Sequence, residues 1–186
     1  LTEDEQNKML DCASKATQED WEQEYLGNLK TQMMEKYGED DLEKLINEGK
    51  LIINREWVDR ILSVSKIYPE ETTNMCKRIN EFFNEQELFA RSMTSIQRHR
   101  PGDFMVEHID NNYNSNLVFA GVAYLNDDFN GGELYFRHLN IRLKPPARSL
   151  ALFSTTEEYL HGIDVVGDGP TRYAMPCFIW TDKTTI

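Results

Sequence analysis

The N-terminal part of the chain carries the four-residue hydrophobic period of helices. Thr2 and Glu5 have the spacing of a capping box, so a helix is expected to begin there. Thr17 and Asp20 repeat this spacing, with Asp in place of the usual Glu or Gln. Beyond them apolar residues recur at every fourth position, with Gly38 as a stop: Trp21, Tyr25, Leu29 and Met33. The pattern predicts an amphipathic helix over residues 18–37 whose apolar stripe is a packing face.

Further helices continue this pattern toward the middle of the chain. Two short ones are expected, over about residues 41–48 and 54–62. Pro69 opens a longer helix, because proline is preorganised for the first helical position. One face of that helix collects four apolar side chains: Met75, Ile79, Phe82 and Phe83. We therefore divide the chain into an N-terminal helical extension, residues 1–68, and a domain, residues 69–186, that starts with this supporting helix.

From residue 95 onward the period becomes strand-like, between clusters of Gly, Pro, Asn and Asp. We predict eight strands, near residues 95–99, 104–110, 118–125, 132–136, 141–143, 149–153, 158–165 and 171–180. Eight short strands without an intervening helix indicate a double-stranded β-helix, or jelly roll, in an α+β protein. Pro176 cannot donate to a ladder, so it predicts an edge, a bulge or a locally unpaired stretch in the last strand.

The charge of the chain limits its partners. The 186 residues carry a formal net charge of −12, and the pI is near 4.8. We therefore expect neither nucleic acid nor an anionic membrane as a partner, because the surplus of Lys and Arg that neutralises phosphate is missing. A basic peptide or a neutral small molecule, such as an amino acid, fits this balance better.

Cysteine usage bears on the compartment. Cys12, Cys76 and Cys177 are too few and too scattered for a disulfide framework, and they form no Cys-x-x-Cys pair for zinc. They favour a reducing compartment, so a cytoplasmic protein is expected. The sequence has no run of about 18 apolar residues, so no transmembrane helix is expected. Because it begins at Leu1 instead of Met, it leaves open whether a targeting segment precedes it.

Candidate metal ligands stand in the second half of the chain. His108 and Asp110 are two residues apart, and side chains at that spacing in a strand project to the same side, where they can hold one ion. A second imidazole would complete the two-histidine, one-carboxylate set that holds one side of an octahedral Fe(II), and His161 is the candidate. Taken alone the pattern is weak, because a histidine on a strand is more often an ordinary packed or surface residue.

Arg172 adds context to this pattern, because it precedes an otherwise apolar segment that ends at Trp180. A guanidinium on a largely buried strand needs a fixed anionic partner, and its planar fork suits a carboxylate. The partner is either a structural Asp or Glu or the distal carboxylate of a bound 2-oxoglutarate.

In this order the motifs resemble the Fe(II)/2-oxoglutarate-dependent dioxygenases, and specifically their prolyl 4-hydroxylase-like branch. The resemblance covers about residues 95–180. Its parts are similar to the family's first two core strands, a hairpin and the final strand: Arg98-His99-Arg100-Pro101-Gly102 with His108-Ile109-Asp110, then the Tyr-Leu-Asn…Gly-Gly-Glu-Leu stretch of residues 124–134, then Arg172-Tyr173-Ala174. In the family, a helix at the place of the one that begins at Pro69 packs against the outer face of the larger sheet.

The resemblance implies that His108, Asp110 and His161 bind Fe(2+), with 2-oxoglutarate on two further positions and O2 on the last. Oxidative decarboxylation of 2-oxoglutarate to succinate and CO2 would then hydroxylate a substrate C–H bond. Ascorbate is an optional further cofactor. Asp110 favours hydroxylation, because related halogenases lose this carboxylate.

The resemblance also implies that Arg172 anchors the distal carboxylate of 2-oxoglutarate, with Tyr124 and His99 as additional donors. Two of these residues depart from the family pattern. His99 stands three residues before Gly102, where many prolyl 4-hydroxylases have a tyrosine. Arg172 stands where the collagen-type enzymes carry lysine, and the Arg-Tyr-Ala sequence looks more like the oxygen-sensing prolyl hydroxylases and the leprecan or lysyl-hydroxylase types.

The leading hypothesis is an Fe(II)- and 2-oxoglutarate-dependent hydroxylase of an amino-acid side chain, with peptidyl or free proline first. Hydroxylation of another residue, such as lysine, or of another small molecule is the alternative within the enzyme class. A catalytically silent jelly roll that binds a ligand is the alternative outside it. A cupin-type isomerase or an oxygenase without a keto acid remains a further reading, in which Arg172 has no role.

Overall fold

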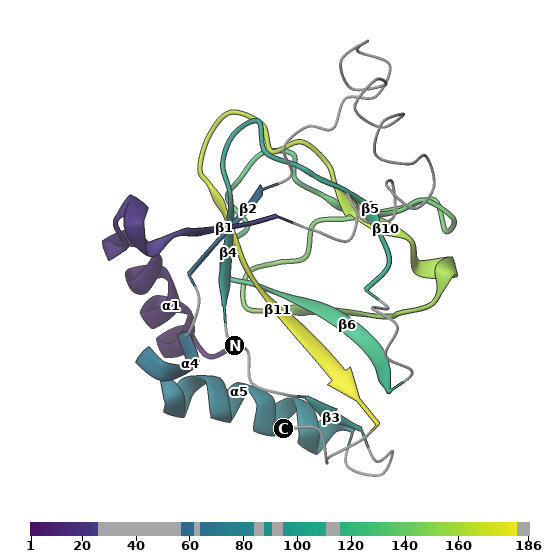
Figure 1. The fold of residues 1–186 in the computed structure, drawn as a ribbon, viewed down its shortest axis with the longest axis horizontal. Helices are drawn as coiled ribbons and strands as arrows, with labels where there is room; N and C mark the ends of the chain where they lie inside the picture. The colour runs from purple at the N-terminus through teal and green to yellow at the C-terminus, as the bar shows by residue number, and fades with distance from the viewer. Residues whose placement is uncertain (26–56, 62–63, 84–87, 91–94, 111–115, 182–186) are drawn as a thin grey trace, which may run out of the picture.

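The computed structural model describes residues 1–25, 57–61, 64–83, 88–90, 95–110 and 116–181, and in this part of the chain the strands form two antiparallel sheets (Figure 1). The larger sheet has the order β1 (Glu22–Tyr25), β2 (Trp57–Ile61), β4 (Ile96–His99), β11 (Arg172–Trp180), β6 (Leu117–Tyr124) and β9 (Leu150–Ser154), with β3 (Phe89–Ala90) also paired to β11. The smaller sheet has the order β5 (Met105–His108), β10 (His161–Ile163), β7 (Leu134–Phe136) and β8 (Ile141–Leu143).

Two of the apolar clusters in the described part of the chain define three layers. The core between the sheets contains side chains from both of them: Ala120, Leu134, Phe136 and Phe153. The second core lies between the larger sheet and the helices α1 (Glu3–Lys15) and α5 (Pro69–Phe82). Both faces of the larger sheet are therefore covered, and the architecture is the predicted jelly roll with supporting helices.

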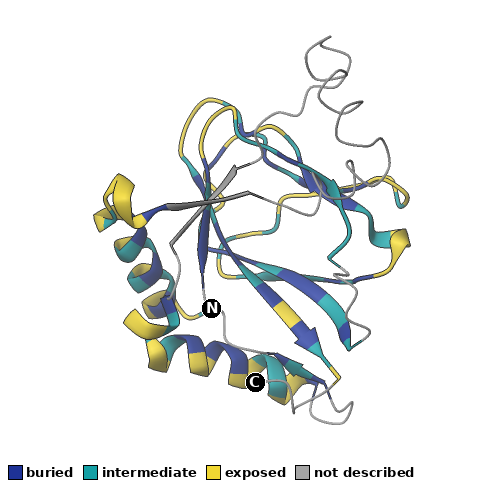
Figure 2. Cartoon of the chain, in the orientation of Figure 1, coloured by how far each residue is buried: buried dark blue, intermediate teal, exposed yellow. Residues whose placement is uncertain are grey.

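Strand β11 shows how this layering sorts side chains. Met175, Cys177 and Ile179 are buried in the core shared with the helices. Residues two apart in a strand project to the same side, so Arg172 and Ala174 point to the opposite face, toward the smaller sheet. Figure 2 shows the buried inner sides and exposed outer sides of α1 and α5.

The predicted helix starts are confirmed for α1 and α5. The backbone N–H of Glu5 donates to the Thr2 hydroxyl over 3.2 Å, and the N–H of Thr2 donates to the Glu5 carboxylate over 2.8 Å, which completes the capping box. Helix α5 begins at Pro69 and buries Met75 against the larger sheet, as expected. One detail was wrong, because Phe82 is 79% exposed instead of facing the core.

The helix predicted over residues 18–37 is wrong at its start. Thr17 and Asp20 do form a capping box, but it caps only the 3-10 helix Gln18–Asp20, and strand β1 follows. The helix predicted over 54–62 is also wrong, because residues 57–61 form β2. These strands pair with each other, and β2 pairs with β4. Pairing with an existing sheet edge overrode the local period, since apolar residues four apart satisfy a strand as well as a helix.

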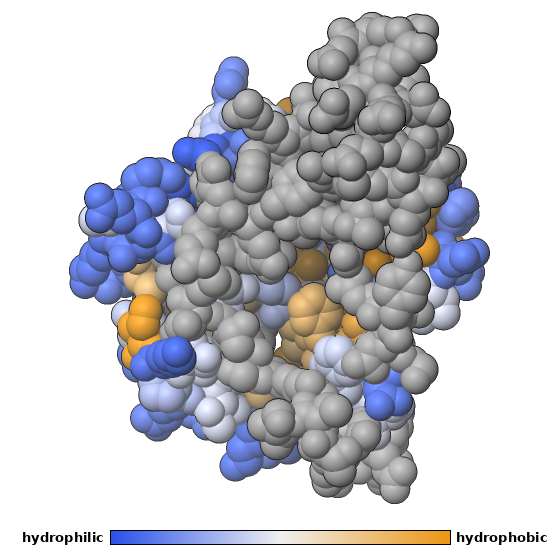
Figure 3. Space-filling model, viewed as in Figure 1, coloured by the Kyte–Doolittle hydropathy of each residue, from blue (hydrophilic) through white to orange (hydrophobic). Residues whose placement is uncertain are grey.

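The N-terminal extension is therefore not wholly helical, and its strands belong to the larger sheet. The boundary between residues 68 and 69 stays a prediction. A short helix, α4 (Val64–Ile67), precedes α5. The predicted helix over 41–48 lies outside the described residues. No helix in the described part of the chain is long and apolar enough to cross a membrane. Figure 3 shows mainly hydrophilic residues over α1 and the 3-10 helix after it, at the left.

All eight strands predicted from residue 95 onward are present, with ends shifted by a few residues. The prediction over 158–165 is the least accurate, because a 3-10 helix (Glu157–Tyr159) precedes β10. The stretch 124–134 does not form the expected hairpin, since β6 and β7 lie in different sheets. Pro176 is in register with Val122 of β6. On its other edge, the pairings of β11 among the described residues end at Ala174 with β4 and begin again at Ile179 with β3, so the predicted unpaired stretch is found on that edge alone.

Candidate metal centre

The three predicted metal ligands lie together on the smaller sheet. His108 ends β5, His161 begins β10, and the two are direct partners in the antiparallel register of these strands. Asp110 follows β5 by two residues, so its carboxylate returns to the side of His108. His108 Nε2 lies 3.6 Å from Asp110 Oδ1, and His161 Nε2 lies 3.4 Å from Asp110 Oδ2. One ligand atom from each residue lies within 4.8 Å of the others, which is compact enough for a single ion.

Backbone hydrogen bonds orient both imidazoles. His108 Nδ1 lies 2.9 Å from the carbonyl oxygen of Val106, and His161 Nδ1 lies 3.0 Å from that of Tyr159. A carbonyl only accepts, so each Nδ1 carries the proton and each Nε2 keeps its lone pair. Both lone pairs belong to the nitrogen atoms near Asp110. Metal-binding histidines are oriented in this way, through the nitrogen that does not touch the metal.

The environment of His161 keeps its imidazole neutral. Its side chain is 6% exposed and packs against the ring of Phe153, with 4.4 Å between ring centroids. Burial and the nearby His108 lower the pKa of His161 to about 4, against the opposing effect of Asp110. A neutral imidazole is the form that binds a metal ion, so the three donors fit a divalent transition metal.

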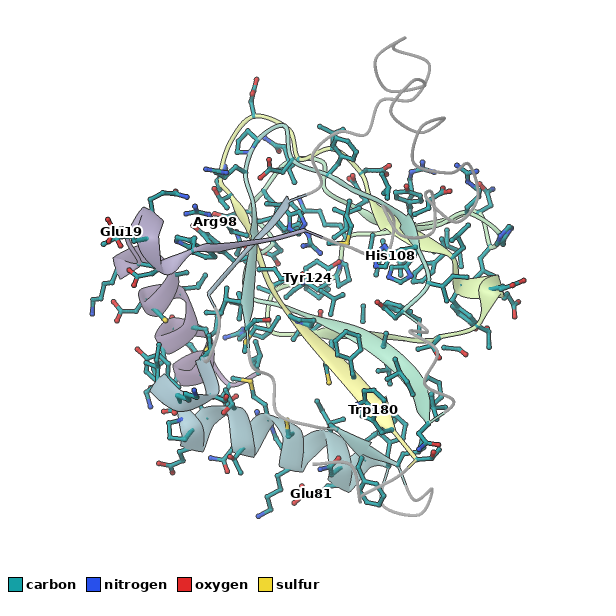
Figure 4. The ribbon with its side chains drawn as sticks, in the orientation of Figure 1. Glu19, Glu81, Arg98, His108, Tyr124 and Trp180 are labelled. Atoms are coloured by element: carbon teal, nitrogen blue, oxygen red, sulfur yellow. The ribbon has the colours of Figure 1, made fainter. Side chains whose placement is uncertain are left out.

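Arg172, Tyr124 and His99 form a second group on the inner face of the larger sheet. His99 and Arg172 are direct partners between β4 and β11, and Arg172 Nη1 lies 3.3 Å from His99 Nδ1. The guanidinium carbon lies 4.9 Å from the centroid of the Tyr124 ring. All three side chains are at most 1% exposed. The sheet thus gathers the three residues that the sequence assigned to the co-substrate, and Figure 4 shows Tyr124 and His108 inside the molecule.

Several polar atoms of this second group are available to bind a ligand. Among the described residues, Arg172 Nε and Nη2 and the Tyr124 hydroxyl are buried without a hydrogen-bond partner. No acidic side chain in the described part of the chain forms an ion pair with Arg172, so the structural Asp or Glu considered from the sequence is not found there. A buried cation of this kind needs an anion, and a carboxylate that accepts from Arg172 and Tyr124 would supply it.

Two glycines in the connection from β6 to β7 allow the chain to pass close to this group. Gly131 and Gly132 have φ angles of +59° and +66°, which glycine adopts without strain. A Cβ atom on Gly132 would lie 3.0 Å from Val166 Cγ2 and 3.3 Å from Arg172 Cδ. In the sequence these glycines are visible only as part of a motif, and their contact with Arg172 depends on residues distant in sequence.

Asn126 in the same connection is a further residue that the sequence analysis did not single out. Its side-chain amide contacts the backbone on both sides of Arg172. The only sequence signal was its place inside the Tyr-Leu-Asn motif, which gives no partner for the amide.

Residues 94–180 match the family model described as the 2OG-Fe(II) oxygenase superfamily. No curated protein sequence matches the chain.

Three solved structures are similar in fold. The viral collagen prolyl hydroxylase of Paramecium Bursaria Chlorella virus-1, as its 2OG complex, has a TM-score of 0.59 and 20% identity over 76% of this chain and 89% of that chain. A prolyl-4-hydroxylase of Pseudomonas putida has a TM-score of 0.54 and 17% identity, over 87% of this chain and 92% of that chain. A prolyl hydroxylase of Trichoplax adhaerens, in complex with a hypoxia inducible factor oxygen degradation domain peptide fragment, has a TM-score of 0.54 and 15% identity. The match covers 76% of this chain and 77% of that chain.

Proposed function

Residues 94–180 form a domain of the 2OG-Fe(II) oxygenase superfamily, and from this premise we propose that the protein hydroxylates a prolyl side chain. Oxygenation that depends on Fe(II) and 2-oxoglutarate is the activity of the superfamily. The prolyl residue, in a peptide or as the free amino acid, is the proposed substrate. The observation that carries the proposal is the pairing of a two-histidine, one-carboxylate cluster with a buried Arg172 that lacks an anion in the described part of the chain.

His108, Asp110 and His161 would hold the iron. Two neutral imidazoles and one carboxylate are a donor set that suits Fe(II) and leaves other coordination positions open. The backbone hydrogen bonds of both histidines keep their free lone pairs toward the carboxylate of Asp110. The aromatic wall beside His161, formed by Phe136 and Phe153, keeps water away from that ligand.

Arg172 and Tyr124 would hold the distal carboxylate of 2-oxoglutarate. Arg172 offers Nε and Nη2, and Tyr124 offers a hydroxyl, all buried. His99 lies against the remaining Arg172 nitrogen and fixes the guanidinium from the β4 side. When bound, the iron and the keto acid would supply the oxidation of a C–H bond by O2, with one oxygen atom entering the substrate and the other entering succinate, and with CO2 as the further product. The protein contributes the orientation of both and the exclusion of bulk water.

Three observations favour a peptide substrate, and the first of them also favours proline as the target residue. The similar structures include prolyl hydroxylases from Paramecium Bursaria Chlorella virus-1 and Trichoplax adhaerens and a prolyl-4-hydroxylase from Pseudomonas putida. One of these contains a bound peptide fragment. The net charge of −12 suits a peptide that carries basic residues around the target. Ascorbate is proposed as an accessory reductant, and a cytoplasmic location is proposed from the cysteine pattern.

Mass spectrometry of products tests this proposal. The purified protein, loaded with Fe(II), is incubated with proline- and lysine-containing peptides of varied charge and with free amino acids. We expect a prolyl peptide to gain the mass of one oxygen atom only when 2-oxoglutarate is present, with an equal amount of succinate. The His108→Ala variant should form neither product.

The matched control for the metal ligand is His138→Ala, because His138 is exposed and lies outside the metal cluster. It should keep the wild-type turnover. Oxygen incorporation into lysyl but not prolyl peptides would reject the proposed substrate. Product formation by His108→Ala would reject the proposed site.

A further inference from the structure

Asn126 extends the backbone ladder beside Arg172. The last register pair between β6 and β11 at this end is Tyr124 with Ala174, and the N–H of Leu125 then donates to the Tyr173 carbonyl over 3.0 Å. The Asn126 side chain continues this pattern. Its Oδ1 accepts from the N–H of Tyr173 over 2.8 Å, and its Nδ2 donates to the carbonyl of Thr171 over 2.8 Å.

These two hydrogen bonds flank Arg172 in the chain. A carboxamide presents one acceptor and two donors, so it replaces a peptide group of a neighbouring strand. Successive residues of a strand alternate between its two faces, so the backbone on either side of a residue determines the direction of its side chain. By fixing the groups at 171 and 173, Asn126 fixes the direction of Arg172 toward the smaller sheet.

Asp128 sets the orientation of the Asn126 amide. Asn126 Nδ2 also donates to Asp128 Oδ1 over 2.7 Å. A carboxylate only accepts, so the amide nitrogen must face Asp128 and the oxygen must face the N–H of Tyr173. The amide therefore has one arrangement that satisfies all three partners. The bonds from Asn126 to Thr171 and Tyr173 are partly buried, whereas the bond to Asp128 is exposed to solvent.

The same connection contacts the Arg172 side chain directly. The guanidinium carbon lies 5.9 Å from the centroid of the Phe129 ring, and Phe129 is fully buried. Gly132 leaves room for the Arg172 side chain, since a Cβ there would come within 3.3 Å of its Cδ. Residues from this connection thus lie against Arg172, and Asn126 is the one whose side chain binds the backbone on both sides of it.

We propose that Asn126 is a positioning residue for the co-substrate anchor: it sets the direction of Arg172 and thereby the affinity for the distal carboxylate of 2-oxoglutarate. This inference rests on the proposed function, because it takes Arg172 as the anchor. Asn126 has no proposed contact with the iron or with the keto end of the ligand. Its removal should therefore affect only the part of binding that the distal carboxylate supplies.

The test compares two ligands by calorimetric titration of the Mn²⁺-loaded full chain. 2-Oxoglutarate and 2-oxopentanoate share the keto acid and the chain length, but 2-oxopentanoate has a methyl group in place of the distal carboxylate. The Asn126→Ala variant should bind 2-oxoglutarate about tenfold more weakly, equivalent to about 1.4 kcal/mol. Its affinity for 2-oxopentanoate should stay within about twofold of wild type, because that ligand does not use Arg172.

Asn130→Ala is the matched control in the same connection. The Asn130 side chain donates to the carbonyl of Asp168 over 2.6 Å, so it also ties the connection to a distant loop, but it does not contact residues 171–173. It should leave both affinities within about twofold of wild type. In the background of Arg172→Ala, the Asn126→Ala change should have no further effect on 2-oxoglutarate binding, since the two residues act through one contact.

Each outcome decides the inference. Unchanged 2-oxoglutarate affinity in Asn126→Ala would overturn it. An equal loss of affinity for both ligands would also overturn it, because that result means a general disturbance of the fold. If wild type shows no preference for 2-oxoglutarate over 2-oxopentanoate, the proposed anchor itself is wrong, which is a separate failure. If Asn126→Ala does not fold, Asn126→Gln, which keeps the amide but displaces it, is titrated with the same criteria.

Discussion

Arg172 is fully buried, and the energy of that burial is the strongest single argument for a ligand. Leaving one buried polar group unpaired costs about 1–3 kcal/mol, and more when the group is charged. Two guanidinium nitrogens and the Tyr124 hydroxyl are in this state within the described part of the chain. A carboxylate bound in the proposed site would offset this cost. At the residue scale, the unpaired donors therefore support the proposed co-substrate site.

Gly132 provides a prediction at the same scale. Gly132→Ala should destabilise the protein by about 1–3 kcal/mol, because φ is positive and the Cβ contacts are tight. It should also weaken 2-oxoglutarate binding, since the new methyl group lies against Arg172 Cδ. Urea unfolding and a calorimetric titration measure the two effects.

Gly102→Ala separates strain from contact. Gly102 has a φ of +91°, but a Cβ there meets no atom within 4 Å. This variant should lose stability and keep its affinity for 2-oxoglutarate. A loss of affinity in Gly102→Ala equal to that in Gly132→Ala would mean that the contact with Arg172 is unimportant.

The sequence was informative for some residues of the site and silent for others. His108 and Asp110 could be paired from their spacing of two, because a strand puts them on one side. His161 and Arg172 could be chosen from their order in the family pattern. The roles of Asn126 and Gly132 depend on Thr171, Tyr173 and Arg172, which are about forty residues away in sequence. No local pattern contains such contacts.

At the scale of elements, helix α5 is the support for the central strands of the larger sheet. Its inner side chains pack in the same core as Met175, Cys177 and Ile179 of β11. Because β11 also begins with Arg172, the helix stabilises the strand that presents the proposed co-substrate anchor. The exposed Phe82 at its end lies outside this core and contacts it through the ring of Phe83.

Two substitutions in α5 test this role. Met75→Ala should lower the free energy of unfolding by about 2–5 kcal/mol, because Met75 is 2% exposed and its truncation leaves a cavity. Phe82→Ala removes a larger side chain from the same helix, but Phe82 is 79% exposed, so the change should stay within about 0.5 kcal/mol. Urea denaturation of both variants measures the difference. Equal destabilisation would show that α5 does not pack through this face.

Elements differed in how well the sequence predicted them. The strands from residue 95 onward were predictable because alternation in a half-buried strand is a local property. Strands β1 and β2 were not, since their conformation comes from pairing with each other and with β4. The four-residue period that begins at Trp21 was interpreted as a helix, because the sequence alone does not show this strand pairing.

At the scale of the whole molecule, the two sheets contribute different residues to the proposed site. The smaller sheet contributes His108 and His161, and the larger sheet contributes Arg172, Tyr124 and His99. The site therefore exists only when both sheets pack on their shared core. In the proposed function, substrate oxidation requires iron on one sheet and the distal carboxylate on the other at the same time. This arrangement links the stability of the jelly roll to the geometry of the reaction.

The iron content of the loaded protein tests the central claim most directly. Wild type and His138→Ala, loaded anaerobically with Fe(II) and desalted, should each retain about one iron per chain, because His138 is exposed and outside the cluster. His108→Ala, Asp110→Ala and His161→Ala should each lose most of it, since each removes one of three donors. Full iron retention in all three of these variants would contradict the assignment of the metal centre.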